Sequence, residues 1–170
     1  IRLSLVGSEM CIRDSASAPK AELDGESLLW MAVLLPAVYD GVARAARDWL
    51  AGFLKQRTPS NLGAPLASLP RFQHVLGRID TLLFANQSLL DGAAAGHISP
   101  QHAGQLKHLV SANAIQAVEL AVEAAGNPGL SRRNPLERHY RDVLCSRIHT
   151  PQDDVVFGQV GRAALTEVQA

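Results

Sequence analysis

The densest group of side chains that could perform chemistry lies between residues 126 and 150 of this 170-residue chain. A Gly-Asn-Pro-Gly break comes first, and His149 stands at the far end, directly before a Thr-Pro pair. A histidine that precedes a helix N-terminus faces the positive end of the helix dipole, which favours the neutral imidazole. Because neutral imidazole can accept a proton from a substrate, His149 is the candidate catalytic residue. The alternative is a histidine that only caps the turn.

The other histidines and cysteines do not form a pattern typical of a metal site. His97, His102 and His108 are spaced five and six residues apart, so they do not share one helix face as an i, i+4 pair would. We expect them to be surface or loop residues, and we predict no metal site. Cys145 has no second cysteine at zinc-ligand spacing and is expected to be a small core residue.

Other motifs that carry chemistry are missing from the sequence. There is no Gly-x-Ser-x-Gly nucleophile turn and no phosphate-binding glycine loop followed by lysine. Arg132, Arg133 and Arg138 form a basic patch, but nearby acidic residues offset it and no aromatic platform accompanies it. The sequence therefore predicts no nucleic-acid binding.

Composition sets the broad class of protein. Lys and Arg number 16, as do Asp and Glu, so the formal net charge is zero, which argues against a nucleic-acid binder or a polybasic membrane-surface protein. No uninterrupted apolar run approaches the roughly 20 residues of a membrane-spanning helix. Hydrophobic residues make up 47% and aromatic residues 5% of the chain, which favours one helical domain with a core. Two cysteines cannot form a disulfide framework, so we expect a cytoplasmic protein.

The N-terminal residues are expected to lie outside the fold. Residues 5–15 resemble the translated sequence of a transposase adapter used in DNA library preparation, so residues 1–15 are interpreted as a disordered artefact. A disordered native terminus is the alternative. Residues 16–27 are expected to be a lead-in linker, and residues 28–170 to form the domain. If an adapter adjoins residue 16, the natural protein continued upstream and this chain is a fragment.

Apolar residues recur at helical spacing along most of residues 28–170. The expected helices cover about 28–56, 72–90 and 100–124, followed by a helix that begins at Pro135 and a short helix over about 151–168. Ser99, Asn134 and Thr150 are each expected to cap a helix that has proline at its first position. The sequence therefore predicts an all-α fold, an up-down antiparallel four-helix bundle with a short extra C-terminal helix.

Two motifs carry a resemblance to a known family. Residues 137–142, Glu-Arg-His-Tyr-Arg-Asp, follow a glycine-rich turn, and Arg57 precedes Gly-Ala-Pro-Leu (63–66) and Gln73. Both motifs resemble the C-terminal helical domain of the acyl-CoA dehydrogenase superfamily, over roughly residues 28–168. Independently of that resemblance, Glu137, Arg141 and Asp142 can be interpreted as a capping and salt-bridge network that holds two helices together.

The resemblance implies a cofactor, a substrate and an assembly. In that family this domain completes an FAD site, with FMN as the alternative flavin here, and forms homodimers or homotetramers through the bundle. Carried over by position, Arg57 contacts the flavin pyrophosphate of a neighbouring subunit, and Gly126 and Gly129 mark a turn that approaches the adenine-nucleotide half. Glu123 and Asn127 depart from the family pattern, which has glutamine and glycine there.

The catalytic segment departs further. Many acyl-CoA dehydrogenases have Glu-Gly-Thr after this helix, but here residues 148–151 are Ile-His-Thr-Pro, without a carboxylate. His149 instead resembles the histidine of a branch that includes flavin-dependent monooxygenases. Three functions follow: an FAD-dependent oxidoreductase acting on the CH–CH group of an acyl-CoA or another small substrate, a monooxygenase that uses O₂ and reduced flavin from a partner flavin reductase, or a non-catalytic helical interaction module. We expect the isolated chain to be inactive.

Overall fold

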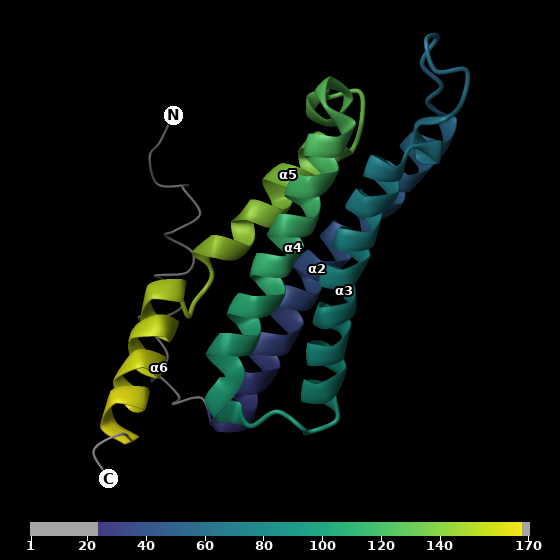
Figure 1. Ribbon diagram of the computed structural model, residues 1–170. Coiled ribbons are helices and arrows are strands. Elements are labelled where there is room, and N and C mark those ends of the chain that lie inside the picture. The colour runs from purple at the N-terminus through teal and green to yellow at the C-terminus, as the bar shows by residue number, and fades with distance from the viewer. Residues whose placement is uncertain (1–23, 168–170) are drawn as a thin grey trace, which may run out of the picture.

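The computed structural model describes residues 24–167, and within them every regular element is a helix. The α-helices are α2 (Gly25–Gln56), α3 (Pro70–Ala94), α4 (Ala103–Ala125), α5 (Leu136–Leu144) and α6 (Asp153–Glu167) (Figure 1). This confirms the all-α prediction. The adapter-like residues and most of the expected lead-in segment lie outside the described residues.

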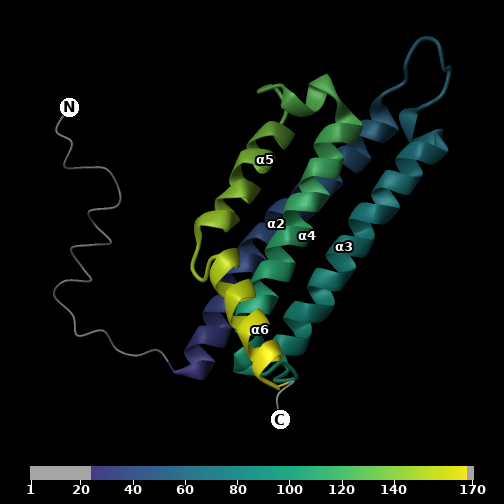
Figure 2. The same ribbon diagram turned by 60° about the vertical axis from the view of Figure 1, so that its left-hand side comes forward.

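Three long helices and one short helix form the bundle. α2, α3 and α4 run side by side in alternating directions, and α5 turns back along α4 and α2, so the topology is up-down and antiparallel (Figures 1 and 2). α5 has nine residues, whereas α2 has 32. α6 is the predicted extra helix and packs against α4. The bundle is therefore asymmetric, with one side covered by a shorter element.

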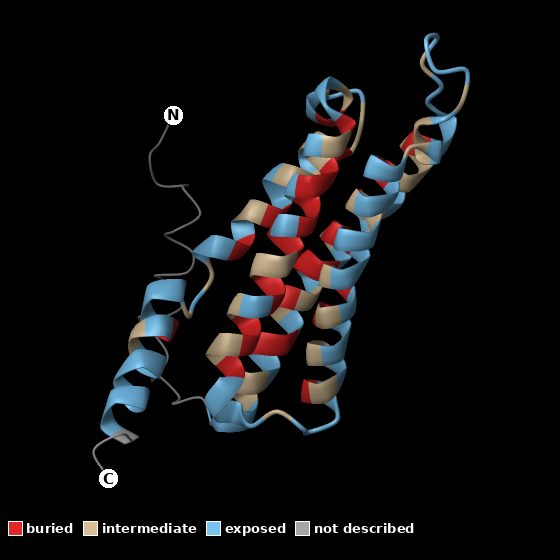
Figure 3. Cartoon of the chain, viewed as in Figure 1, coloured by how far each residue is buried: buried red, intermediate tan, exposed pale blue. Residues whose placement is uncertain are grey.

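The main core lies where α2, α3 and α4 face one another (Figure 3). Its fully buried members include Leu50, Leu54, Ile79, Val118 and Leu136. Alanines on α2 and α4 let the helices approach closely, since a methyl side chain adds little width. A second, smaller cluster of buried residues lies at the end of the bundle that holds the start of α2, and contains Ala32, Val33, Ala93, Ala103, Leu106 and Val110.

Polar side chains join the three long helices inside the bundle. Asn86 of α3 is fully buried, and its Nδ2 donates to Asp40 Oδ1 of α2 at 2.8 Å and to Val110 O of α4 at 3.1 Å. Asn113 Nδ2 donates to Asn86 Oδ1 at 2.9 Å, and Arg44 Nε donates to Asp40 Oδ2 at 2.6 Å. Because each buried group has partners, the network fixes the relative register of the helices without leaving an orphan charge.

α2 begins earlier and runs more continuously than the sequence suggested. Asp24 is its N-cap and accepts a hydrogen bond from Ser27 N at 2.7 Å, so residues 25–27 are helical rather than part of a linker. Pro36 was expected to kink this helix or to start its regular part. It lies instead in the interior of one assigned helix, and it is buried.

α2 is also long and apolar enough to cross a bilayer by length and composition alone. Polar residues interrupt the apolar sequence of α2, so it contains no uninterrupted apolar run of membrane-spanning length. The core helix of a soluble protein passes the same test of length and composition. α2 places Asp40 and Leu50 in the core of the bundle. One third of the most apolar 18-residue window of α2 is buried in the bundle, and Trp30, Leu34 and Val38 of the same helix are exposed.

The predicted caps are wrong in their details. Ser99 precedes a 3-10 turn, Pro100–His102, that leads into α4, but its side chain makes no capping hydrogen bond. Asn134 Nδ2 donates to Pro128 O at 2.8 Å, which braces the preceding turn instead of accepting from α5. α6 begins at Asp153 rather than next to Thr150. At Asn134, a hydrogen bond within the preceding turn takes the place of the expected cap.

Cys145 differs from the expectation as well. It begins a 3-10 turn, Cys145–Ile148, and its thiol is exposed, with Sγ 3.7 Å from Arg141 O. Ser146 takes the buried position of that turn. The change from α-helical to 3-10 geometry after Leu144 rotates the following side chains, which a helical periodicity cannot predict.

Candidate functional site

His149 lies where the segment between α5 and α6 meets α2. It follows the 3-10 turn in an extended conformation and is half-buried. Its Nε2 is 2.7 Å from the hydroxyl oxygen of Tyr39, a buried residue of α2, and the two ring centroids are 5.8 Å apart. Tyr39 could not be identified as a site residue from the sequence, because 110 positions separate it from His149 and no local pattern links the two residues.

The Tyr39–His149 hydrogen bond can have either polarity. A phenol hydroxyl both donates and accepts, so Nε2 accepts from Tyr39 in one tautomer and donates to it in the other. Burial raises the pKa of Tyr39, with smaller contributions in the same direction from Cys145 and Asp142. The phenol therefore stays protonated at neutral pH and remains a neutral partner for the imidazole.

α4 holds the segment that follows His149. Lys107 is almost fully buried, and its Nζ donates to Pro151 O at 3.0 Å. His108, the next residue of α4, places Nδ1 3.1 Å from Asp153 Oδ1 and stacks edge-on against Phe157. Because both residues lie on α4, the chain from Pro151 into α6 is fixed against the bundle. α6 starts four residues after His149, so the histidine stands further from a helix N-terminus than predicted.

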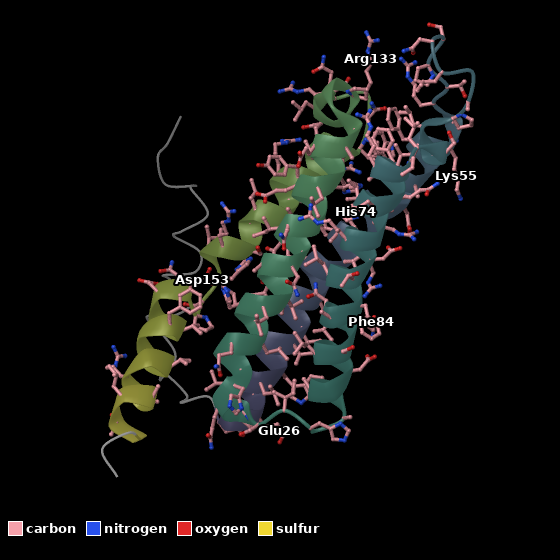
Figure 4. All side chains as sticks on the ribbon, in the orientation of Figure 1. Glu26, Lys55, His74, Phe84, Arg133 and Asp153 are labelled. Atoms are coloured by element: carbon pink, nitrogen blue, oxygen red, sulfur yellow. The ribbon has the colours of Figure 1, made fainter. Side chains whose placement is uncertain are left out.

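Arg57 lies at the end of the bundle where α2 ends. Its backbone is extended, and its carbonyl accepts from Leu66 N at 2.9 Å, which closes the loop between α2 and α3. Its side chain is exposed and forms no hydrogen bond or ion pair with the residues in the range 24–167. The turn after α4, which includes Arg133, lies at the same end of the molecule (Figure 4).

The two predicted glycines shape that turn. Gly126 ends α4 with a φ of 65°, a conformation that favours glycine, and its N–H donates to Val122 O at 3.0 Å. Gly129 is buried, and a Cβ there would lie 3.1 Å from Val122 O. Its N–H donates to Gly126 O at 2.8 Å. Close packing of the turn on α4 therefore requires these glycines, and their own amide hydrogens are engaged within the turn.

Glu137 and Arg141 form an ion pair within one helix. Arg141 Nε donates to Glu137 Oε2 at 3.1 Å, and Nη2 donates to Oε1 at 3.3 Å. Both residues belong to α5, one turn apart, so this pair stabilises α5 and does not bridge two helices as the network interpretation expected. Leu136 and Val143, both fully buried, attach α5 to the core.

The predicted site residues therefore fall into two places. His149 is held on the side of the bundle by α2 and α4, while Arg57, Gly126 and Gly129 lie at its end. Within the described part of the chain, no three His, Cys, Asp or Glu side chains are placed to hold a metal ion. The side position could transfer a proton through an imidazole, and the end position holds a guanidinium that forms no ion pair within residues 24–167.

The chain matches one protein family over most of its described length. The sequence model for the acyl-CoA dehydrogenase C-terminal domain matches residues 24–165. YdbM of Bacillus subtilis (strain 168), named as an acyl-CoA dehydrogenase, is 32% identical over 77% of this chain and 36% of its own length. The 3-sulfinopropanoyl-CoA desulfinase of Advenella mimigardefordensis is 32% identical over 76% of this chain and 32% of its own length. The chain thus spans about a third of the curated relatives that it matches.

Solved structures show the same fold. Butyryl-CoA dehydrogenase from Megasphaera elsdenii superposes with a TM-score of 0.74 at 25% identity, covering 83% of this chain and 37% of that one. An acyl-CoA dehydrogenase from Geobacillus kaustophilus gives a TM-score of 0.72 at 17% identity, with 82% and 37% covered, and that likeness concerns the fold alone.

Proposed function

We propose that this chain is part of an FAD-dependent oxidoreductase acting on the CH–CH group of an acyl thioester. The premise is that the chain belongs to the acyl-CoA dehydrogenase family, whose C-terminal helical domain it forms. The observation that carries the proposal is the family match over residues 24–165, which includes both the Arg57 loop and the His149 segment. Sequence upstream of this chain would supply the remaining two thirds of the enzyme.

The end of the bundle suits the phosphates of a flavin nucleotide. The Arg57 side chain is exposed and forms no ion pair within residues 24–167, so its guanidinium is available to bind a phosphate. The engaged amides of Gly126 and Gly129 assign those residues to the shape of the turn rather than to direct hydrogen bonds with the cofactor. When bound, the flavin supplies a two-electron acceptor. FAD is the proposed cofactor, with FMN as the alternative.

His149 is the proposed base. In the tautomer whose Nε2–H donates to Tyr39 Oη, Nδ1 is free to accept the α-proton of an acyl thioester. The resulting imidazolium keeps its Nε2–H bonded to Tyr39, so the phenol positions the ring before and after proton transfer. No carboxylate stands in residues 148–151 to take this role.

A second function is favoured by that same missing carboxylate. A neutral imidazole at His149 could hydrogen-bond within the site of a flavin monooxygenase, which would take O₂ together with reduced flavin from a partner reductase. A helical interaction module without chemistry is the remaining alternative. Its prediction is that neither substrate nor flavin binds.

One preparation separates the three functions: the protein purified with its natural upstream sequence. Tightly bound yellow FAD that acyl-CoA bleaches supports the oxidoreductase. Turnover that depends on added reduced flavin and O₂ supports the monooxygenase, and overturns the first proposal. A colourless protein that is inactive in both assays leaves the interaction module.

The isolated 170-residue chain is proposed to have no enzymatic activity. The complete enzyme is proposed to be cytoplasmic. A helical bundle alone cannot enclose an isoalloxazine ring, so the isolated chain would not hold flavin and substrate together. The complete enzyme is proposed to form a homodimer or homotetramer, in which Arg57 reaches the flavin of a neighbouring subunit. Measurable turnover by the isolated chain would contradict this account.

A further inference from the structure

Lys107 is a charged side chain inside the bundle that the proposed reaction does not use. It lies on α4, is 2% exposed, and its Nζ donates to Pro151 O at 3.0 Å. Glu119 and Asp153 line the same cavity and balance the nearby cations, but their ion pairs are with other residues. Because burying an ammonium is costly, the hydrogen bond to Pro151 O is the contact that explains why a lysine stands here.

The carbonyl that Lys107 holds lies two residues after His149. Residues 149–152 lie between the 3-10 turn and α6, outside any helix. In the described part of the chain, two side chains hydrogen-bond to this segment: Tyr39 at the imidazole of His149, and Lys107 at Pro151 O. The segment is therefore attached to α2 through its first residue and to α4 through its third.

The residue between the two attachments adds no third one. Thr150 is exposed, and its side chain makes no hydrogen bond within residues 24–167. The bond from His149 Nε2 to Tyr39 Oη is 2.7 Å long, and it leaves the ordinary hydrogen-bond range once it lengthens beyond about 3.2 Å. A displacement of the Pro151 backbone by a fraction of an ångström to an ångström would thus be enough to release the ring.

We infer that Lys107 is a positioning residue for His149. Through Pro151 O it fixes the backbone that follows the histidine, which keeps Nε2 on Tyr39 Oη and leaves Nδ1 free to accept a proton. Lys107 is buried and does not touch the substrate, so it acts through Pro151. The inference rests on the proposed function, because it takes His149 as the base.

The first test reads the tautomer of His149 in the 170-residue chain without flavin. A neutral imidazole that keeps one tautomer has one protonated and one unprotonated nitrogen, with well-separated ¹⁵N chemical shifts, whereas exchange between tautomers brings the two shifts together. At alkaline pH we expect separated His149 shifts in the wild-type chain, because Tyr39 fixes Nε2. Tyr39→Phe removes the hydroxyl and should merge the shifts, which defines the signature of a released ring.

Variants of Lys107 then test the attachment. Lys107→Met keeps nearly the same length without a donor, and should merge the His149 shifts as Tyr39→Phe does. Lys107→Gln, whose amide falls short of Pro151 O, should do the same and serves if the methionine variant does not fold. Lys107→Arg restores a donor, for which the adjacent cavity of about 350 Å³ has room, and should return the separated shifts.

The matched control separates positioning from stability. Leu106→Ala, at the neighbouring position of α4, weakens the core but leaves the Lys107 hydrogen bond in place, so the His149 shifts should stay separated. Separated shifts in the folded Lys107→Met or Lys107→Gln chain would overturn the inference. Merged shifts in Leu106→Ala would overturn it as well, because any loss of stability would then release the ring.

The enzyme purified with its upstream sequence gives an independent measurement. Lys107→Met should slow flavin reduction by acyl-CoA by about ten- to a hundredfold, since a small misplacement of a reacting group has effects of this size. The dissociation constant for acyl-CoA should stay unchanged, and Lys107→Arg should restore the rate. A wild-type rate for Lys107→Met in an enzyme that His149→Ala slows would overturn the positioning role alone, whereas an enzyme that His149→Ala leaves unchanged would contradict the proposed function itself.

Discussion

α4 and α6 are both amphipathic helices of this chain, yet their surroundings differ. α4 buries twelve of its 23 residues between α2, α3 and α5. In α6, Val156 is buried among the described side chains, while Val155, Phe157, Val160 and Leu165 are exposed (Figure 3). The comparison teaches that an apolar pattern predicts a helix but not what the helix packs against. α4 packs against α2, α3 and α5, whereas α6 makes few contacts with the rest of the described chain.

The largest expected difference comes from one matched pair of leucines. Leu106→Ala removes a side chain that is 2% exposed on α4, and should lower the free energy of unfolding by about 2–5 kcal/mol because it leaves a cavity. Leu165→Ala on α6, where the leucine is 74% exposed, should change it by less than about 0.5 kcal/mol. Urea denaturation followed by circular dichroism measures both values, and equal losses would break the comparison.

The buried polar network of the long helices should come next. Asn86→Ala leaves Asp40 Oδ1 and Asn113 Nδ2 without their partner inside the bundle, so we expect a loss of about 1–3 kcal/mol. Asn61→Ala, in the exposed loop after α2, is the control and should have little effect. A loss for Asn86→Ala no larger than the control's would mean that the network contributes nothing to stability.

Val156 tests how α6 is attached. Its side chain packs against Gly104 of α4, where an added Cβ would lie 3.0 Å from Val156 Cγ2. Val156→Ala should cost about 1–2 kcal/mol of local stability, at about 0.8 kcal/mol per buried methylene, and should speed amide exchange in α6 while exchange in α4 stays unchanged. Val155→Ala, exposed on the same helix, is the matched control. Faster exchange in both helices would show that α6 and the bundle unfold as one unit.

The smallest effect is expected from a surface ion pair. Arg47 Nε donates to Asp80 Oδ1 at 2.7 Å, and this hydrogen bond lowers the pKa of Asp80. A lowered carboxyl pKa stabilises the folded state above the ordinary value of 3.8, and that contribution is lost as the pH falls through the lowered pKa. Since Asp80 is half exposed, Asp80→Asn should cost less than about 1 kcal/mol at neutral pH and nothing at strongly acid pH. Asp154→Asn on α6 is the control, and a loss for Asp80→Asn that does not shrink on acidification would exclude the ion pair as its cause.

Much of the fold could be predicted from the sequence, because helical periodicity and Gly-Pro breaks are local signals. The long helices, at Gly25–Gln56, Pro70–Ala94 and Ala103–Ala125, lie close to the expected ranges of about 28–56, 72–90 and 100–124. The geometry of the turns could not be predicted in the same way. Asn134 bonds back to Pro128 O rather than capping α5, and the 3-10 turn after Leu144 exposes Cys145.

The candidate site shows the same division. His149 stood out by its place before a Thr-Pro pair, but its partner Tyr39 lies on another helix and became evident from the packed structure. No local motif distinguishes Lys107, and its burial against Pro151 O follows from how α4 meets the C-terminal segment. Whether Arg57, Gly126 and Gly129 meet a flavin stays a prediction.

The most direct test is the rate at which acyl-CoA reduces the bound flavin, measured by anaerobic stopped-flow absorbance in the protein purified with its upstream sequence. The account predicts that the wild-type flavin is bleached, and that His149→Ala slows this step by about a hundredfold or more. His97→Ala, which changes an exposed histidine of the loop between α3 and α4, should leave the rate unchanged. A protein without flavin, or a His149→Ala variant as fast as wild type, would contradict the proposed role of this domain.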